Sequence, residues 1–140
     1  MTTLAEVTKP AGLPLKISLW LAQSIVFAVF CAAGFSKLTM PIPQLSAMMA
    51  WTGQLPETFV RSIGIIDLAG GLGIMLPFVT RIQPRLGVLA ALGCTILQIL
   101  ASAFHASRGE FAVLPLNLVL LLCSAFVFWG RRTMAPIASR

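Results

Sequence analysis

Four long apolar stretches dominate the pattern of hydrophobic and polar positions along the chain, and they cover approximately residues 15–35, 59–79, 86–106 and 111–129. A helix of about 20 residues is long enough to cross a hydrocarbon core of about 30 Å. None of the stretches alternates between apolar and polar residues, as the strand of a membrane barrel would. The pattern therefore predicts an all-α integral membrane protein, an antiparallel four-helix bundle formed by residues 15–130.

The segments that connect these stretches differ in length. Residues 80–85 and 107–110 form short connections, which make the flanking helices antiparallel neighbours. Residues 38–58 form a longer connection that contains prolines and a glycine. Within it, residues 44–51 predict either a two-turn helix lying in the membrane interface, with Trp51 at headgroup depth, or an irregular loop packed over the bundle.

The composition supports a membrane domain and argues against a disordered protein or an ordinary soluble domain. Of the 140 residues, 58% are hydrophobic and 10% are charged, whereas a soluble domain averages about 25% charged residues. The first apolar stretch is longer than the roughly 7–15 residues of a signal-peptide core, so we expect it to remain as a span. We therefore expect one membrane domain and no separate catalytic domain.

Basic residues are distributed unevenly between the two ends of the predicted bundle. Those at the end that holds both termini are Lys9, Lys16, Arg81, Arg85, Arg131, Arg132 and Arg140. Those at the other end are Lys37, Arg61 and Arg108. Because cytoplasmic segments are enriched in Lys and Arg, both termini are predicted to be cytoplasmic, with residues 1–14 as an N-terminal tail and residues 131–140 as a basic C-terminal tail. The chain has a net charge of +6. Because its basic residues lie mostly at the ends of apolar stretches, we attribute this charge to the orientation of the spans and expect no nucleic-acid partner.

Motifs for metal, haem or nucleotide chemistry do not occur in the sequence. The chain has 1 histidine and 3 cysteines, and Cys31, Cys94 and Cys123 lie in different apolar stretches. Such cysteines form neither a disulfide framework nor a zinc site, and no P-loop, dinucleotide-binding or nucleophile motif is present. We therefore expect no metal site.

The most informative feature is a group of polar residues near the end opposite to the termini. Its ionisable members are Lys37, Glu57, Arg61, Asp67, His105, Arg108 and Glu110. Gln98 shares a helix face with His105, and Asn117 shares one with Glu110. An isolated charge at the centre of a span costs at least about 2.5–3.5 kcal/mol. We therefore expect these groups to pair with one another or to line a cavity.

Asp67 is the deepest ionisable residue of this group. Arg61 precedes it by six residues, which places the two side chains about 120° apart around one helix and disfavours their pairing. We therefore expect a partner on another helix, with Lys37 and His105 as candidates. Two interpretations stay open, because Asp67 either forms only an ion pair that joins helices, or binds a ligand or transfers protons.

Small residues indicate where the helices pack closely, because they let helix backbones approach one another in a membrane. They are Ala32, Ala33 and Gly34 in the first stretch, Gly64, Ala69, Gly70, Gly71 and Gly73 in the second, and Gly87, Ala90, Ala91 and Gly93 in the third. These positions predict close helix packing and say nothing about chemistry.

Several of these residues lie in segments that resemble the DoxX family of small bacterial membrane proteins, in particular its DoxX-like branch. The segments are AGFSKL at residues 33–38, LPE at 55–57, FVRSIGIID at 59–67, FHxxRGE at 104–110 and NL at 117–118. The resemblance covers about residues 19–131 and implies a multi-pass protein of the bacterial inner membrane. Some members of the family are small membrane subunits of quinone-linked sulfur oxidoreductases, others are linked to membrane complexes that handle oxidative stress, and distant eukaryotic relatives act in assembly or trafficking.

Three functions are compatible with these observations. The first is a membrane subunit of a quinone-linked or oxidative-stress-related redox system, in which a quinone binds between the helices and a partner redox protein supplies electrons. Asp67 and His105 are then the candidate catalytic residues, and Lys37 or Arg61 stabilises the reduced anion. Glu110 and Asn117 complete the predicted ligand-binding set. The second function is a membrane assembly or interaction protein whose ion cluster is structural, and the third is a small transporter, which four spans could form only as a homo-oligomer.

Overall fold

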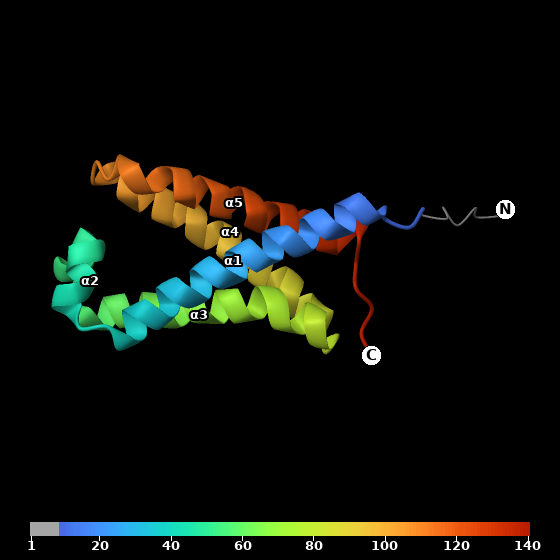
Figure 1. Cartoon of the computed structure of the whole chain (residues 1–140), viewed down its shortest axis with the longest axis horizontal. Helices are drawn as coiled ribbons and strands as arrows, with labels where there is room; N and C mark the ends of the chain where they lie inside the picture. The colour runs from blue at the N-terminus through green and yellow to red at the C-terminus, as the bar shows by residue number, and fades with distance from the viewer. Residues whose placement is uncertain (1–8) are drawn as a thin grey trace.

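A computed structural model of the chain describes residues 9–140 (Figure 1). Four long helices are accompanied by shorter helical elements, and no strand occurs within the described part of the chain. The elements are α1 (Leu13–Thr39), α2 (Ile42–Met48), the 3-10 helix η1 (Ala50–Gly53), α3 (Glu57–Thr80), α4 (Pro84–Ser107), the 3-10 helix η2 (Phe111–Val113), α5 (Leu114–Trp129) and the π-helical turn η3 (Gly130–Met134).

Prolines and tight turns set the boundaries of the helices. α1, α4 and α5 each carry a proline within their first two positions, where a backbone N–H would have no intrahelical acceptor. Glu57 begins α3 and places a carboxylate at the positive end of that helix. The α3–α4 connection consists of residues 81–83, and Arg81 and Gln83 adopt positive φ angles of 61° and 46°. This short turn brings α3 and α4 together as antiparallel neighbours, as its length predicts.

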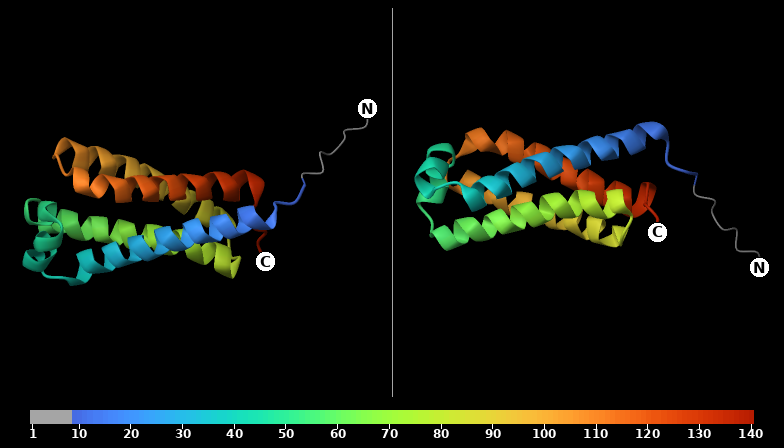
Figure 2. Two further views of the ribbon diagram at one scale, coloured as in Figure 1. Left: turned by 45° about the horizontal axis from the view of Figure 1, so that its top comes forward. Right: turned by 60° about the horizontal axis from the view of Figure 1, so that its bottom comes forward.

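The four long helices form a ring in the order α1, α3, α4, α5. The most extensive contacts join α1 to α3 and α4 to α5, so the bundle consists of two helix pairs (Figure 2). Each of α1, α3 and α4, and the combined segment Phe111–Met134, is long and apolar enough to cross a membrane. These features confirm the all-α, four-helix membrane bundle. The side of the membrane on which the termini lie stays a prediction.

The bundle has an apolar interior and an apolar exterior. Its main core cluster is centred on the buried side chains of Val26, Phe30, Ile74, Phe78 and Val127. Large aliphatic side chains also point outward along the helices, including Leu89, Leu100 and Leu122, each of which is more than half exposed. Soluble proteins rarely expose such extended apolar surfaces, so lipid is the environment that matches this exterior.

Glycines allow α1 and α3 to approach one another closely. A Cβ atom at Gly34 would lie 2.7 Å from the carbonyl oxygen of Gly64 and 2.7 Å from the amide nitrogen of Leu68. This contact confirms the close packing predicted for these two glycines. Gly93 in α4 is different, because no atom of the described residues lies within 4 Å of the position that its Cβ would occupy. The prediction that Gly93 is needed for close packing is therefore wrong.

The elements α2 and η1 cover the end of the bundle opposite to the C-terminus (Figure 1). The short helix predicted within residues 44–51 is present in α2, and a 3-10 turn follows it. Leu45 and Trp51 point inward and pack in a second core cluster with Val60. Trp51 is only 7% exposed, and its ring lies edge-on to that of Phe104 at 5.9 Å. Trp51 is therefore an interior side chain, because the connection folds back over the bundle. Of the two alternatives open for residues 44–51, the segment combines the short helix of one with the packing over the bundle of the other.

The C-terminal residues also depart from the prediction of a basic tail over residues 131–140. The helical path continues from α5 into η3, and Arg131 is only 3% exposed. Arg131 Nε and Nη2 donate to Oε1 of Gln23 in α1 at 2.8 and 2.7 Å. Beyond η3 the chain returns to the α3–α4 connection, where the Arg140 N–H donates to the Arg81 carbonyl oxygen. Arg131 is thus a buried residue of the bundle, because a neutral acceptor on α1 binds its guanidinium.

Candidate functional site

A cavity of about 480 Å³ lies at the α2 end of the bundle, between the two helix pairs. Its polar lining consists of Lys37, Asp67, Gln98, His105, Glu110 and Asn117. All of these except Gln98 belong to the ligand-binding set predicted from the sequence, and the remaining member of that set, Arg61, lies elsewhere. The structure therefore brings most of the predicted polar residues into contact with one cavity.

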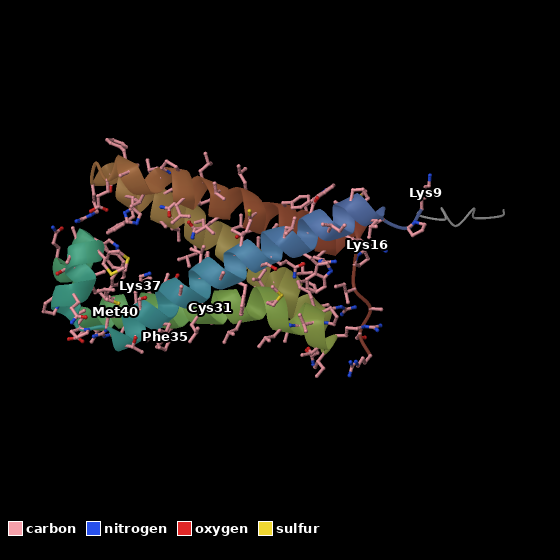
Figure 3. All side chains as sticks on the ribbon, in the orientation of Figure 1. Lys9, Lys16, Cys31, Phe35, Lys37 and Met40 are labelled. Carbon is pink, nitrogen blue, oxygen red and sulfur yellow. The ribbon has the colours of Figure 1, made fainter. Side chains whose placement is uncertain are left out.

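Lys37 and Asp67 form a buried ion pair in this cavity. Lys37 Nζ donates to Asp67 Oδ2 at 2.8 Å, and the two residues are 6% and 7% exposed. The pair joins α1 to α3 at the position where Gly64 leaves room for the lysine stem, since a Cβ at Gly64 would lie 2.8 Å from Lys37 Cβ. Figure 3 shows Lys37 near the α2 end of α1. The prediction that Asp67 pairs with a residue on another helix is confirmed.

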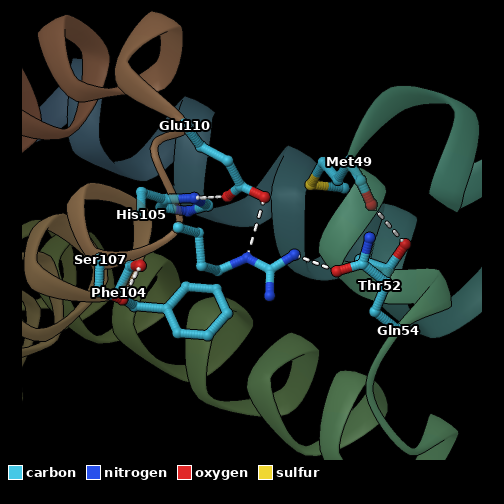
Figure 4. A network of polar contacts seen from close by, with 8 residues as sticks. Met49, Thr52, Gln54, Phe104, His105, Ser107 and Glu110 are labelled. Atoms are coloured by element: carbon cyan, nitrogen blue, oxygen red, sulfur yellow. Dashed lines mark hydrogen bonds and ion pairs between the residues drawn. The ribbon is translucent and has the colours of Figure 1, made fainter.

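A second group of charges lies at the end of α4 (Figure 4). His105 Nδ1 and Glu110 Oε2 are 2.6 Å apart, and Arg108 Nε donates to Glu110 Oε1 at 2.9 Å. The hydrogen bond with His105, assisted by that from Arg108, lowers the pKa of Glu110 below its usual range. Arg108 also donates to the amide oxygen of Gln54. This contact joins the end of α4 to the segment formed by α2 and η1.

Arg61 takes a different position from the one that the sequence predicts. Its Nη1 donates to the carbonyl oxygens of Lys37 and Met40, and its Nε and Nη2 donate to Glu57. The carbonyls at the C-terminal end of a helix lack intrahelical donors, and Arg61 satisfies two of them at the end of α1. Its guanidinium therefore anchors α1 to α3 outside the cavity lining.

Two neutral residues of the cavity retain unpaired polar atoms. Gln98 in α4 and Asn117 in α5 are both buried, and within residues 9–140 neither Gln98 Oε1 nor Asn117 Nδ2 has a hydrogen-bond partner. An unpaired buried polar atom costs about 1–3 kcal/mol. One of these atoms is an acceptor and the other is a donor. Asn117 Nδ2 therefore lacks an acceptor, and Gln98 Oε1 lacks a donor, within this part of the chain.

Apolar and aromatic side chains form most of the remaining wall, including those of Trp51, Leu97 and Leu120. Lys37 Nζ lies 5.9 Å from the centroid of the Trp51 ring, within the range of a cation–π contact. The predicted ligand-binding set included neither Trp51 nor Gln98. The available indications were a tryptophan in a connection bounded by prolines and the shared helix face of Gln98 and His105.

The chemistry available in the cavity follows from these side chains. Asp67 and His105 can each hold or release a proton, and Lys37 supplies positive charge beside the aspartate. The apolar wall suits a hydrophobic ligand, and the few polar groups would orient it. In the described part of the chain, no cluster of three or more His, Cys, Asp or Glu side chains could hold a metal ion.

Comparison with known protein families shows a match over most of the chain. The model of the DoxX-like family matches residues 21–127, whereas no curated protein and no solved structure matches the chain. The matched region contains all six polar residues of the cavity lining. Since this match covers most of a chain with four membrane-length apolar helices, the protein belongs to the DoxX-like family of membrane proteins.

Proposed function

We propose that the protein is a small membrane subunit of a quinone-linked redox system and that the cavity at the α2 end binds the quinone ring. The observation that carries this proposal is the pair of unsatisfied atoms of opposite kind, Gln98 Oε1 and Asn117 Nδ2, on residues that line a largely apolar cavity. Quinone oxygens accept hydrogen bonds in the oxidised form and donate them in the reduced form. The oxidised ring can therefore accept from Asn117 Nδ2, and the reduced ring can in addition donate to Gln98 Oε1.

The residues of the cavity fit such a ligand in two further respects. Leu97, Leu120 and Trp51 provide apolar surface for the ring and the start of an isoprenoid tail. The cavity also lies within a bundle whose outer surface is apolar, so a lipid-soluble ligand shares the environment of the protein. A strongly charged ligand fits less well, because the acids and bases of this end already bind one another.

Each charged residue has a role in this proposal. A bound quinone would supply two-electron redox chemistry, in which a partner redox protein provides the electrons and two protons are taken up. Asp67 and His105 hold protons at the cavity surface, and Lys37 stabilises negative charge near Asp67. Glu110 orients His105 through its hydrogen bond to Nδ1. Gln98 and Asn117 position the ring.

The test is quinone binding to the purified protein in lipid nanodiscs, measured by the thermal midpoint and by quinone retained through purification. We expect ubiquinone or menaquinone to raise the midpoint, because a ligand that binds only the folded state stabilises it by mass action. Asn117→Leu should weaken binding by about tenfold or more, because a bound ring would lose a hydrogen bond from this buried donor. It should leave the ligand-free protein folded, since the amide nitrogen has no partner to lose.

Ser124→Ala provides the matched control. Ser124 is also buried on α5 and its hydroxyl also lacks a partner among the described residues, but it does not line the cavity. We expect this variant to bind quinone as the unaltered protein does. Absence of any quinone-dependent shift in the unaltered protein, or equal binding by the Asn117→Leu variant, would contradict the proposal.

A second function is favoured by a different observation, namely that every acidic side chain at the α2 end has a basic partner within the chain. In this alternative the ion pairs only stabilise a surface that docks an assembly partner. Cross-linking in the native membrane would then recover a specific protein through residues of α2 and η1. The double variant Lys37→Met with Asp67→Leu replaces the buried pair by apolar residues. If the second function holds, this variant should still form the cross-link. If the first function holds, it should lose quinone binding.

The proposed setting is the bacterial inner membrane, with both termini in the cytoplasm. The support is the excess of basic residues at the end that holds the C-terminus. The variants Arg140→Cys and Gln54→Cys, each made without the native cysteines, can be labelled in intact cells with a reagent that does not cross membranes. We expect label at position 54 only. Label at position 140 only would reverse the orientation.

A further inference from the structure

The end of the bundle that holds the C-terminus carries basic side chains and no acidic partner for them among residues 9–140. The basic residues there are Lys9, Lys16, Arg81, Arg85, Arg131, Arg132 and Arg140. The aspartate and glutamate side chains within the described residues are Glu57, Asp67 and Glu110, and each forms its ion pair at the α2 end. This end therefore carries positive charge that the described chain does not compensate.

Arg131 differs from the other basic residues of this end because its side chain is buried. Its guanidinium donates to Gln23 Oε1 and, at 3.4 Å, to the Ala135 carbonyl oxygen. It also lies 4.7 Å from the ring centroid of Trp20 and 5.4 Å from that of Phe78. All of these partners are neutral. Removing a charge from water is costly unless an opposite charge lies nearby, so the site favours an anion from outside the described chain.

A cavity of about 710 Å³ adjoins Arg131, and we call it the Arg131 pocket. Arg85 and Arg132 line it together with Arg131, and Phe78, Val88 and Ile137 supply apolar surface. Pro84, at the start of α4, also lines it, and the N-terminal end of a helix attracts negative charge. Arg131 also lines a separate cavity of about 470 Å³, whose wall includes Lys9 and Lys16.

We propose that the Arg131 pocket binds the phosphate group of an anionic phospholipid. Three arginines around one cavity provide the planar, multiple hydrogen-bond donors that phosphate oxygens accept. Lipids and soluble phosphate esters both carry a phosphate group. A lipid is favoured here because the pocket lies at the ends of membrane-length helices and has an apolar wall. A phosphate that carries acyl chains would place them against the apolar exterior of the bundle. Basic pockets between spans are a common form of lipid recognition.

This proposal is independent of quinone binding, because the two cavities lie at opposite ends of the bundle and share no lining residue. The test is the retention of phosphatidylglycerol, relative to phosphatidylcholine, by the protein released from mixed nanodiscs into a native mass spectrometer. We expect preferential retention of phosphatidylglycerol by the unaltered protein. Arg85→Gln and Arg132→Gln should each reduce that preference about fivefold, in line with the contribution of one basic residue near an anionic lipid surface.

Arg140→Gln is the matched control, because it removes the same charge at the same end from a side chain that does not line the pocket. It should retain phosphatidylglycerol as the unaltered protein does. Both test arginines are exposed, and Arg132 lies 5.5 Å from the centroid of the Phe128 ring. Their replacement should leave the fold intact, because an exposed cation–π contact contributes only about 0.5–1 kcal/mol, and an unchanged thermal midpoint in phosphatidylcholine would verify this. Equal retention of the two lipids, or equal loss in the control, would overturn the proposal. A midpoint raised as much by glycerol phosphate as by phosphatidylglycerol would assign the pocket to a soluble phosphate ester and overturn the lipid as its source.

Discussion

At the α2 end of the bundle, three acidic side chains meet basic partners within the chain, whereas at the other end the buried Arg131 meets only neutral groups among the described residues. Charged groups are buried at both ends, and at each end their removal from water costs free energy unless an opposite charge lies nearby. At the α2 end the chain compensates its own charges and leaves two neutral amide atoms unsatisfied. At the other end the positive charge of Arg131 has no negatively charged partner among the described residues.

This difference separates the ligands that the two ends can accept. A site whose charges are already paired offers little to an additional ion, and its unpaired amide atoms favour a neutral polar group. A site with excess positive charge favours an anion, and lipid headgroups are the most abundant anions beside a membrane protein. The same bundle can therefore hold two chemically distinct amphiphiles without competition between them.

The largest effect is expected from breaking the charge balance at the α2 end. Lys37→Met leaves Asp67 buried without its partner, and removal of one member of a buried ion pair destabilises a protein by about 3–5 kcal/mol. Combining it with Asp67→Leu should recover most of this loss, because no buried charge remains. The free energy of unfolding in mixed micelles measures both. Equal losses in the single and double variants would show that the pair does not govern stability.

The exposed pair at the same end is the control for that measurement. Glu57 and Arg61 form an i,i+4 pair whose side chains are 62% and 26% exposed. Glu57→Gln should change the free energy of unfolding by about 0–1 kcal/mol, since solvent screens an exposed pair. A loss as large as that of Lys37→Met would mean that burial does not distinguish the two pairs.

A smaller loss is expected at the other end from Gln23→Leu. This change removes the acceptor of two hydrogen bonds from Arg131 and the donor of one to the Ile74 carbonyl oxygen. It should destabilise the protein by at least about 1.5–3 kcal/mol, the range for hydrogen bonds to a charged group. Thermal unfolding in phosphatidylcholine nanodiscs would measure it. A neutral effect would show that Arg131 already has another partner, and the charge contrast between the two ends would fail.

The close contact between α1 and α3 should give a loss of about 1–3 kcal/mol when it is overpacked. In Gly34→Ala the new methyl group meets backbone atoms of α3 at 2.7 Å, so α1 must move and carry Lys37 away from Asp67. Gly93→Ala is the control, because its new methyl group meets open space and alanine favours a helix. Unfolding free energies that fall equally in both variants would contradict this packing.

The smallest expected effect is a dependence on pH at the α2 end. The lowered pKa of Glu110 means that its contacts with His105 and Arg108 contribute stability at neutral pH. That contribution should disappear as the pH falls below the ordinary glutamate pKa of about 4.3 and through the lowered value of the folded state. The difference in thermal midpoint between the unaltered protein and Glu110→Gln should therefore shrink from pH 7 to pH 3. A difference that grows on acidification would contradict the sign of the shift.

The hydrophobic pattern was sufficient to predict the four helices and their antiparallel order, because span length and short turns leave few alternatives. The rotation of each helix was predictable only in part. The spacing of Arg61 and Asp67 showed that the two diverge, and it left Lys37 and His105 as candidate partners of Asp67. The structure shows that Lys37 is the partner and that His105 pairs with Glu110. The spacing could not show that Arg61 binds the carbonyls at the end of α1, since that depends on the path of another helix.

Two features depended on tertiary contacts that the sequence does not reveal. Trp51 is buried because residues 42–53 fold back over the bundle, and a single tryptophan near prolines is equally suited to a membrane interface. Arg131 is buried because Gln23, 108 positions earlier in the chain, accepts its hydrogen bonds. A basic residue after an apolar stretch normally indicates a span end, so the sequence alone favoured a solvated tail.

The division of the bundle into two helix pairs has a mechanical consequence. Lys37 and Asp67 both belong to the α1–α3 pair, whereas His105 lies in the last turn of α4 and Glu110 follows that helix. Movement of the pairs apart at the α2 end, where they diverge (Figure 1), would break the Arg108–Gln54 and Trp51–Phe104 contacts and neither ion pair. The Gln23–Arg131 contact would hold the pairs together at the far end. Such a movement would widen the cavity at the α2 end, while the ion pair within each helix pair stays intact.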